Sequence, residues 1–567
     1  MKALKFEEYP FYIPNQKKIE NKLNILLDKV LKASNAKDAS VAIKKWDKEI
    51  QNIETNFGVI YVLYSCNTGN EKYKLAQNKT DEIGPVVADY QNKFNKIVTA
   101  YPFRKDLEKE FGEYLFKMYD ASLKSFDSKI IPDMIEENKL VSEYDAILGG
   151  AQIEFRGSFY NLSQLGKFTA DKDRKTRREA AMAMDKWLGE NEKAIGDIYD
   201  KLVHLRDSMA KKLGYKNFVE LGYLRLGRMD YDAQMVSNYR AQIAKYVVPL
   251  CNKLYRKQIQ QLGIKKPQYF DYNLRFADGN PIPAGNKDYL VNAAKNMYED
   301  LGKETGEFIN FMIDNHLMDL EARKGKAPGG YCTYFPNYKA PFIFSNFNGT
   351  DGDVNVLCHE GGHALQAYLS SKIKVPEYRS PTLEACEIHS MSMEFFAWPY
   401  MDAFFKGDAT KYKYMHLADS IEFLPYGITI DEFQHWVYEN PDATHLQRCA
   451  KFKEIESRYT PHKKYDCTPT LDHGAYWIRQ SHVFGSPFYY IDYTLAQVVA
   501  FEFTCLMHKN HEKAWKKYIR LCKFGGQAPF VTLLAKNHLR NPFDEGNVKK
   551  VITPLKKILA DLEKDLF

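Results

Sequence analysis

The sequence predicts a mainly helical protein with more than one lobe. The chain has 567 residues, more than one compact core usually holds, so we expect two or more lobes. Residues 1–150 place apolar side chains three and four positions apart, as in "KKIENKLNILLDKVLKASN", which is typical of helices. Helical patterns resume near Asp171, and they continue from Ser380 to the C-terminus. The break at 152–162, "QIEFRGSFYNL", has short-strand character.

A second break in the helical pattern covers residues 328–347, "PGGYCTYFPNYKAPFIFSNF". Gly and Pro interrupt two short runs that are rich in aromatic residues, which is the pattern of a β-hairpin. We therefore expect two short strands directly before the helix that follows.

Composition and charge narrow the class of protein. The net charge of +7 is mild for a chain of this length, so we expect no nucleic-acid partner and no anionic membrane surface. Nine scattered cysteines without a C-x-x-C pair favour reduced thiols over a secreted disulfide framework. The N-terminal residues contain no apolar core of signal-peptide length, and no run of about 20 apolar residues occurs. We expect a cytoplasmic protein.

The stretch "LCHEGGHALQ" contains the pattern H-E-x-x-H. On a helix, His359 and His363 are four residues apart and point from one face, where two imidazoles can bind one zinc ion. Glu360 would then act as a base toward a zinc-bound water. Asp351 or Asp353 is the expected N-cap of this helix.

Two glycines, Gly361 and Gly362, interrupt the same helix. Each costs about 0.8–1 kcal/mol relative to Ala in a helix interior. Because glycine lacks a Cβ atom, we interpret the pair as sites where a neighbouring strand or helix comes close to the metal-binding helix.

A third ligand is expected on the next helix, "SPTLEACEIHSMSMEFFAW", with Ser380 as its cap. Glu387 and Glu394 share one face of that helix, and Glu384 lies one turn earlier on nearly the same stripe. Glu387 is the preferred ligand and Glu384 the alternative, while Glu394 would accept the free N–H of a ligand histidine. His389 points off this face and is either structural or a substrate contact.

A tyrosine-rich segment, "SHVFGSPFYYIDYTLAQ", contains His482, Tyr490 and Tyr493. Tyr490 and Tyr493 are three residues apart, on one helix face. An imidazole and hydroxyl groups could stabilise an oxyanion that forms on a zinc-bound carbonyl. The alternative is a tyrosine-rich helix that packs in the core, and spacing alone does not separate the two.

These segments together resemble a known family. "CHEGGHALQ" followed by "PTLEACEIHSMSMEFFAWP" is similar to the thimet oligopeptidase and oligoendopeptidase F family of zinc metallopeptidases, in particular its Pz-peptidase-like branch. "NFVELGYLRLGRMDY", "LPYGITIDEFQHWVYENP" and "SPFYYIDYTLAQ" also resemble stretches of that branch. The likeness is weaker at the start, so we divide the chain into an N-terminal helical region, 1–150, and a catalytic region, 151–567.

The resemblance implies a two-lobed helical ellipsoid with a deep central channel and a small β-sheet next to the zinc-binding helix. In the family, the zinc-ligating Glu precedes another motif Glu by seven residues. Glu387 and Glu394 have that separation, so the resemblance selects Glu387 over Glu384 as the ligand of a single zinc ion. The family's transition-state-binding His and tyrosines match His482, Tyr490 and Tyr493.

We therefore expect a zinc-dependent endopeptidase that hydrolyses internal bonds of short unstructured peptides, with a metal-bound water activated by Glu360. The alternatives are a zinc carboxypeptidase or dipeptidase, and a non-catalytic peptide-binding protein with a structural zinc. Candidate substrate contacts lie on the aromatic hairpin, which can pair with an extended peptide, and beside the oxyanion residues. They are Gly330, Tyr331, Phe344, Asn346 and Tyr489.

Overall fold

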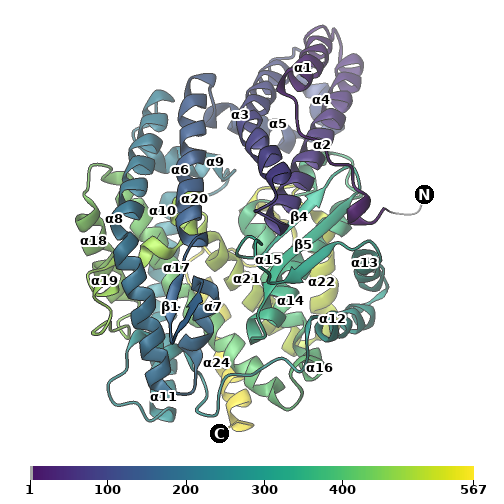
Figure 1. The fold of residues 1–567 in the computed structure, drawn as a ribbon. Coiled ribbons are helices and arrows are strands. Elements are labelled where there is room, and N and C mark those ends of the chain that lie inside the picture. The colour runs from purple at the N-terminus through teal and green to yellow at the C-terminus, as the bar shows by residue number, and fades with distance from the viewer. Residues whose placement is uncertain (1–3, 567) are drawn as a thin grey trace.

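The computed structural model describes residues 4–566, and helices make up most of that range (Figure 1). The mainly helical fold class predicted from the sequence is confirmed, with two small sheets inserted between helices. None of the helices in the described range is long and apolar enough to cross a membrane.

The first helices of the chain occupy one end of the molecule (Figure 1). They are α1 (Gln16–Leu31), α2 (Ala36–Cys66), α3 (Glu71–Thr99), α4 (Arg104–Phe111) and α5 (Glu113–Ser125), whereas α6 (Ile131–Gly149) packs against the long helix α8 (Arg174–Lys212). An asparagine side chain accepts a backbone N–H at the start of each of the first three, a typical N-cap. Helices α1–α5 share a hydrophobic core in which Trp46 stacks on Phe94, with 4.7 Å between ring centroids.

A two-stranded antiparallel ribbon, β1 (Ile153–Phe155) with β2 (Ser158–Tyr160), follows α6. It confirms the short-strand character of 152–162. The helices between this ribbon and the larger sheet are α7 (Leu162–Gly166), α8 (Arg174–Lys212), α9 (Phe218–Arg225), α10 (Ala233–Tyr246), α11 (Val248–Gln261), α12 (Lys287–Leu301) and α13 (Lys303–Asp314).

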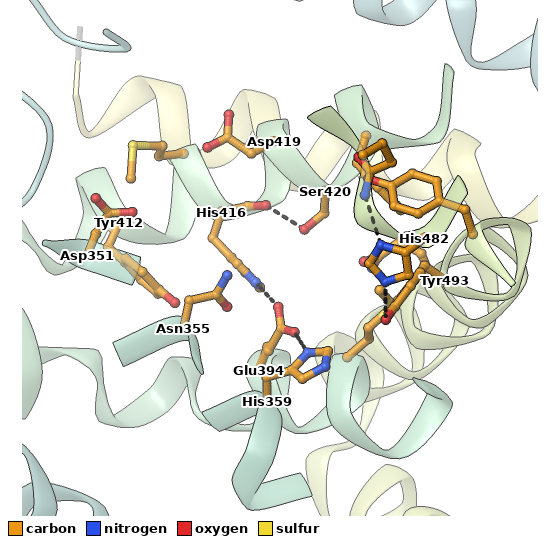
Figure 2. Close-up of a pocket in the computed structure, with 16 residues that line it drawn as sticks. Asp351, Asn355, His359, Glu394, Tyr412, His416, Asp419, Ser420, His482 and Tyr493 are labelled. Atoms are coloured by element: carbon orange, nitrogen blue, oxygen red, sulfur yellow. Dashed lines mark hydrogen bonds and ion pairs between the residues drawn. The ribbon is translucent and has the colours of Figure 1, made fainter. Parts of the chain in front are cut away.

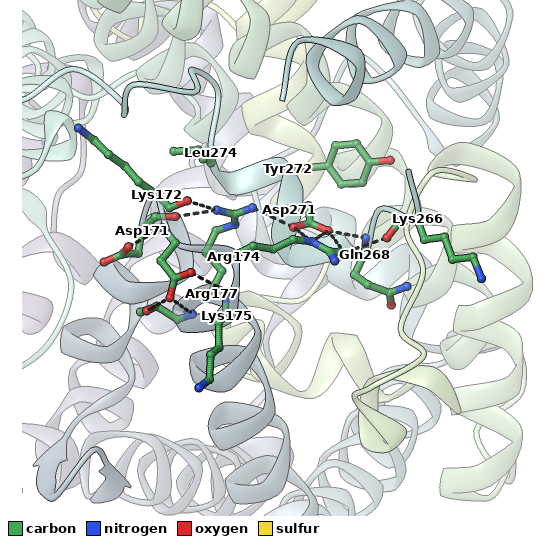
Figure 3. Close-up of polar contacts among 12 residues, drawn as sticks. Asp171, Lys172, Arg174, Lys175, Arg177, Lys266, Gln268, Asp271, Tyr272 and Leu274 are labelled. Atoms are coloured by element: carbon green, nitrogen blue, oxygen red, sulfur yellow. Dashed lines mark hydrogen bonds and ion pairs between the residues drawn. The ribbon is translucent and has the colours of Figure 1, made fainter. Parts of the chain in front are cut away.

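The start of the long helix α8 is tied to the segment after α11 by a buried carboxylate (Figure 3). Asp271 is fully buried, and its oxygens accept hydrogen bonds from Arg174 at 2.9 Å and from Arg177 at 3.0 Å. A buried carboxylate requires such pairing, because its charge would otherwise lose its solvation without compensation.

The larger sheet has three strands in the order β3-β5-β4. β4 (Tyr331–Phe335) pairs antiparallel with β5 (Ala340–Phe347), so the hairpin predicted at 328–347 is confirmed. β3 (Met318–Glu321) adds a parallel strand on the other side of β5, and the sequence analysis did not predict it. The sheet packs against the helix that carries the H-E-x-x-H pattern.

That helix is α14 (Asp351–Ser370), and it packs on α15 (Leu383–Phe396). Neither expected cap is right. Thr350 is the N-cap of α14, and Asp353 instead accepts the backbone N–H groups of Asn348 and Gly349 before the helix. α15 begins later than Ser380, with Thr382 at its N-cap.

The two glycines of α14 face neighbouring elements, as the sequence predicts. A Cβ atom on Gly362 would lie 2.6 Å from the His389 carbonyl oxygen and 2.7 Å from the Ser390 Cα atom, both on α15. A Cβ atom on Gly361 would overlap the Tyr298 hydroxyl of α12. The glycines therefore allow close packing around the metal-binding helix.

The rest of the described chain is mostly helical as far as Lys564, as predicted. The helices are α16 (Met401–Phe405), α17 (Ala409–Glu439), α18 (His445–Tyr459), α19 (Pro469–Asp472), α20 (Ser481–Gly485), α21 (Tyr490–Lys509), α22 (His511–Phe524), α23 (Phe530–Lys536) and α24 (Asn547–Lys564). α21 packs along α15 and α17, which brings the tyrosine-rich segment to the helix that carries Glu387.

Candidate active site

Two helices bring together three side chains that can ligate a metal. His359 and His363 project from one face of α14, and Glu387 projects from α15 toward them. Their candidate ligand atoms all lie within 4.8 Å of one another. The Glu387 Oε2 atom is 3.3 Å from His359 Nε2 and 3.4 Å from His363 Nε2.

These separations fit a tetrahedral zinc site. Ligand atoms about 2.0–2.2 Å from zinc and separated by the tetrahedral angle lie about 3.3–3.5 Å apart. Burial by itself would lower the pKa of His359, but the carboxylates of Glu387 and Glu394 raise it well above its usual value. The same negative charge favours a bound cation, so both spacing and charge suit a divalent metal.

A chain of hydrogen bonds holds His359 in this orientation (Figure 2). Its Nδ1 atom is 2.7 Å from Glu394 Oε1, and the other Glu394 oxygen is 2.6 Å from His416 Nε2. The Trp398 indole N–H donates to His416 Nδ1 at 3.0 Å, so a neutral His416 carries its proton on Nε2 and donates it to Glu394. Glu394 therefore accepts from both histidines and leaves His359 Nε2 facing the metal group.

Glu387 is also held by neighbours. Its Oε1 atom accepts the Tyr489 hydroxyl at 2.6 Å, and Oε2 accepts the Ser390 hydroxyl at 2.9 Å. Burial alone would raise the pKa of Glu387, but the charge and hydrogen bonds of His363 and His359 lower it well below its usual value. Glu387 is thus kept as a carboxylate, the form that ligates metals.

Glu360 lies next to this group with one oxygen free. Its side chain is 7% exposed, and Oε2 has no hydrogen-bond partner in the described part of the chain. Burial raises the pKa of Glu360, although the neighbouring His359 and His363 lower it. A carboxylate with a free oxygen and a raised pKa is suited to take up and return a proton.

His482 and Tyr493 form a hydrogen-bonded pair that lines the same pocket as His359 (Figure 2). The Gln480 amide donates to His482 Nδ1 at 2.9 Å, and its own oxygen accepts from the Tyr426 hydroxyl, which fixes the amide orientation. A neutral His482 therefore carries its proton on Nε2, 3.2 Å from the Tyr493 oxygen. Burial lowers the pKa of His482 and raises that of Tyr493, so the hydroxyl remains a donor.

A cavity of about 400 Å³ lies between the hydrogen-bonded pair of His359 and Glu394 and the pair of His482 and Tyr493. His359, Glu394, His482, Tyr490 and Tyr493 all line it. The Tyr490 hydroxyl has no hydrogen-bond partner among the described residues, and burial raises its pKa, which leaves it free to donate to a ligand in the cavity.

Two residues considered from the sequence lie outside the site. Glu384 is buried among Arg228, Tyr231 and Thr382 and does not belong to the metal-binding group, although burial raises its pKa to about 6. His389 is fully buried with its Nδ1 atom 3.5 Å from a cysteine sulfur of α22, and burial lowers its pKa to about 3. His389 is therefore structural and does not contact substrate.

The candidate substrate contacts on the hairpin differ in accessibility. Phe344 is fully buried, stacked on Tyr331, and belongs to the central strand, whose backbone groups pair on both sides. The expectation that Phe344 contacts substrate is therefore wrong. Asn346 donates to the carbonyls of residues 327 and 329 and so holds the loop before β4. Gly330 lies beside Glu360, since its Cβ position is 3.8 Å from Glu360 Oε1.

Comparison with known proteins agrees with this geometry. The chain matches the peptidase M3 N-terminal domain over residues 6–126 and peptidase family M3 over residues 303–551. It is 45% identical to a solved structure of Pz peptidase A with an inhibitor; the superposition covers 98% of this chain and 99% of that one, with a TM-score of 0.96. The chain belongs to peptidase family M3.

Two more distant proteins are also similar to this chain. An oligoendopeptidase F homologue from Borreliella burgdorferi is 23% identical over 370 residues, and the match covers 63% of this chain but only 60% of that relative's length. Oligoendopeptidase-F from Enterococcus faecium shares the fold, with a TM-score of 0.64 at 13% identity, over 97% of this chain and 98% of that one. Membership of the family supports peptide hydrolysis and implies a bound metal, generally zinc.

The residues that hold the proposed site residues in place through hydrogen bonds were missed by the sequence analysis. His416 was not identified, because it lies on another helix, α17, and no spacing along one helix connects it with Glu394. Trp398 was also missed, although it follows Glu394 by four residues. Gln480 was not identified either, although it lies only two residues before His482. A polar residue next to a candidate catalytic histidine is a pattern that could have found it.

Proposed function

We propose that this M3 peptidase is a zinc-dependent endopeptidase that cleaves internal bonds of short unstructured peptides. The observation that supports it most is the tetrahedral spacing of His359, His363 and Glu387 beside the free carboxylate oxygen of Glu360. A structural metal site normally has four protein ligands, whereas three ligands beside a base are typical of a catalytic site.

The ligands His359, His363 and Glu387 would hold the zinc ion. When bound there, zinc supplies a Lewis acid for the peptide carbonyl and for the attacking water. The contribution of Glu394 and Tyr489 is to orient His359 and Glu387, through the hydrogen bonds of 2.7 and 2.6 Å.

Glu360 is the proposed general base. Its free Oε2 atom takes a proton from the attacking water and passes it to the nitrogen of the leaving amine. The raised pKa of Glu360 helps the second half of this transfer, because a carboxyl group that holds its proton longer is a better acid near neutral pH.

His482, Tyr490 and Tyr493 are the proposed stabilisers of the oxyanion that forms on the scissile carbonyl. Burial keeps both hydroxyls protonated, so that each can donate a hydrogen bond to the oxyanion, and His482 and Tyr489 hold the Tyr493 hydroxyl in place. Removal of one such donor in other enzymes costs about 10²–10³ in kcat.

The substrate is proposed to bind as an extended strand. β4 is an edge strand of the described sheet, so its outer backbone groups can pair with a peptide next to Gly330 and Glu360. Tyr331 would contribute a side-chain contact. We further propose that residues 1–150 wall a channel over the catalytic region, 151–567, and that the channel admits unfolded peptides but no folded domains.

The lining of the cavity favours endopeptidase over carboxypeptidase activity. A carboxypeptidase needs a cationic group to bind the terminal carboxylate, and none of the described residues that line the cavity is Lys or Arg. Digestion of a peptide library, with products mapped by mass spectrometry, should give internal cuts. Release of single residues or dipeptides from one end would overturn this part of the proposal.

Replacement of the base tests the mechanism. Glu360→Gln should retain one zinc per active site, because Glu360 is no ligand, and should lower kcat by about 10²–10⁴. Glu384→Gln is the matched control, a buried carboxylate outside the group that should leave zinc content and turnover near the parent values. Parent-like hydrolysis by Glu360→Gln would rule out the proposed role.

Size selectivity provides a further test of the channel. A stable folded domain should resist the enzyme, whereas a peptide cut from the same domain should be hydrolysed. Rapid cleavage of the intact domain would show that the site is an open cleft and that the channel does not exist.

A further inference from the structure

A second group of metal-binding side chains lies where α8, α18 and α19 meet, on helices other than those of the proposed active site (Figure 1). Glu192 comes from α8, His445 and Cys449 come from the first two turns of α18, and His473 is the C-cap of α19. One candidate ligand atom from each lies within 4.8 Å of the other three. Two nitrogens, one oxygen and one sulfur thus converge on one point.

The contacts within this group are short. Glu192 Oε1 is 2.8 Å from His445 Nε2 and 2.7 Å from His473 Nε2. Cys449 is one helical turn after His445, and its sulfur is 3.4 Å from the same His445 Nε2 atom. Expansion of the nitrogen–oxygen separations by about 0.6 Å would give the edges of a tetrahedral zinc site.

With neutral histidines, the hydrogen-bond pattern supplies too few protons for these contacts. The Nδ1 atom of His473 is 3.1 Å from the Pro469 carbonyl oxygen, which can only accept, so Nδ1 carries the proton. A neutral His473 then directs the lone pair of Nε2 at the Glu192 carboxylate. A histidine that donates from Nδ1 to a carbonyl is oriented as a metal ligand usually is, and a cation between Nε2 and the carboxylate would satisfy both.

The backbone of α8 is shaped to admit the His445 ring. Gly196 lies one turn after Glu192 in the interior of this 39-residue helix, where glycine is unfavourable. A Cβ atom at Gly196 would lie 2.8 Å from His445 Nδ1 and 3.2 Å from two ring carbons. The glycine therefore creates the space in which His445 reaches Glu192.

Glu192 differs from Asp271, the buried carboxylate that contacts the start of α8 from the segment after α11. Asp271 is neutralised by Arg174 and Arg177 (Figure 3). No Lys or Arg in the described range forms an ion pair with Glu192, whose ion-pair partners are His445 and His473. Its environment thus consists of metal-ligand side chains instead of permanent cations.

We propose that Glu192, His445, Cys449 and His473 bind one divalent cation of borderline softness, of which Zn²⁺ is the best match. Imidazole and thiolate select zinc over Mg²⁺ and Ca²⁺, and four protein ligands leave no open position for a substrate. The site is therefore structural and ties α18 and α19 to α8. Binding requires the Cys449 thiolate, so the thiol proton is released to solvent.

Titration of the metal-free full-length protein with Co²⁺ tests this proposal. We expect two equivalents to bind, together with a thiolate-to-cobalt charge-transfer absorption in the near ultraviolet. The His359, His363 and Glu387 group contains no sulfur, so this absorption reports the second site alone. Saturation at one equivalent without the absorption would overturn the proposal, whatever the outcome for the proposed peptidase mechanism.

Variants assign the ligands. Cys449→Ser should abolish the absorption and the second equivalent while peptide hydrolysis continues, and Cys467→Ser is the control, a partly exposed cysteine outside the group that should keep both. Because Cys449 is buried, His473→Ala at the exposed rim is a second variant, whose loss of the second equivalent needs no repacking of the core. Persistence of the absorption in Cys449→Ser would refute the assignment.

Discussion

A methyl group added at Gly362 should separate the two helices that carry the proposed zinc ligands. In Gly362→Ala, the new Cβ atom would lie 2.6 Å from the His389 carbonyl oxygen and 2.7 Å from the Ser390 Cα atom, whereas ordinary contacts are 3.4–4 Å. Both neighbours are backbone atoms of α15 and cannot rotate away. The substitution therefore forces α14 and α15 apart by about 0.7 Å at the point where these atoms would overlap.

The consequence for zinc follows from the ligand spacing. His363 is on α14 and Glu387 is on α15, and their ligand atoms are 3.4 Å apart. A separation of about 0.7 Å moves them to about 4.1 Å, beyond the edge of about 3.3–3.5 Å in a tetrahedral site. We expect zinc affinity to fall about 10–100-fold, as when a ligand loses the group that orients it. Overpacking in Gly362→Ala should lower the free energy of unfolding by about 3 kcal/mol, and the higher helix propensity of alanine should restore about 1 kcal/mol of this loss.

Zinc competition against a chromophoric chelator measures this affinity directly. Gly149→Ala is the control, because a Cβ atom at Gly149, the last residue of α6, has no neighbour within 4 Å, and it should keep the parent zinc affinity. Gly361→Ala should be intermediate, since it meets only the Tyr298 hydroxyl end. Parent zinc affinity in Gly362→Ala would refute the reasoning about close helix packing.

Three further predictions concern the same fold. Tyr493→Phe should lower kcat about 10²–10³-fold with parent zinc affinity. Tyr489→Phe should lower zinc affinity, because of these two tyrosines only Tyr489 donates to the ligand Glu387, and equal zinc loss in both variants would contradict these roles. His416→Ala should weaken zinc binding about tenfold or more in the same competition assay, since it removes one donor to Glu394, and unchanged affinity would count against the relay. Burial raises the pKa of Asp47 to about 8. The folded protein keeps this proton while the unfolded chain loses it above a pKa of about 4, so folding stability falls as pH rises from about 4 to about 8. Asp47→Asn should flatten this fall in urea unfolding between about pH 4 and pH 8, and parallel curves would disprove the sign.

Local spacing explains why the centre of the site was predictable. A helix places residues four apart on one face, so the pattern of His359 and His363 defined a chelating pair without any tertiary information. The i, i+7 separation of Glu387 and Glu394 likewise placed both carboxylates on one stripe. The hairpin at 328–347 could be predicted because Gly and Pro interrupt its aromatic runs.

Only the tertiary structure decided which faces meet. His416 supports Glu394 because α17 packs beside α15, and no periodicity in the sequence encodes that contact. Phe344 was expected to contact substrate because it lies on the aromatic hairpin, but it belongs to the central strand of the order β3-β5-β4 and is buried.

The second metal-binding group shows the same limit most clearly. His445 and Cys449 are four residues apart on α18, which is a chelating spacing visible in the sequence. The other two members, Glu192 and His473, are separated by 281 residues and come together only because α19 packs against α8. Helical periodicity determines which side chains share a face, but the partner of that face is selected by burial and close packing over the whole chain.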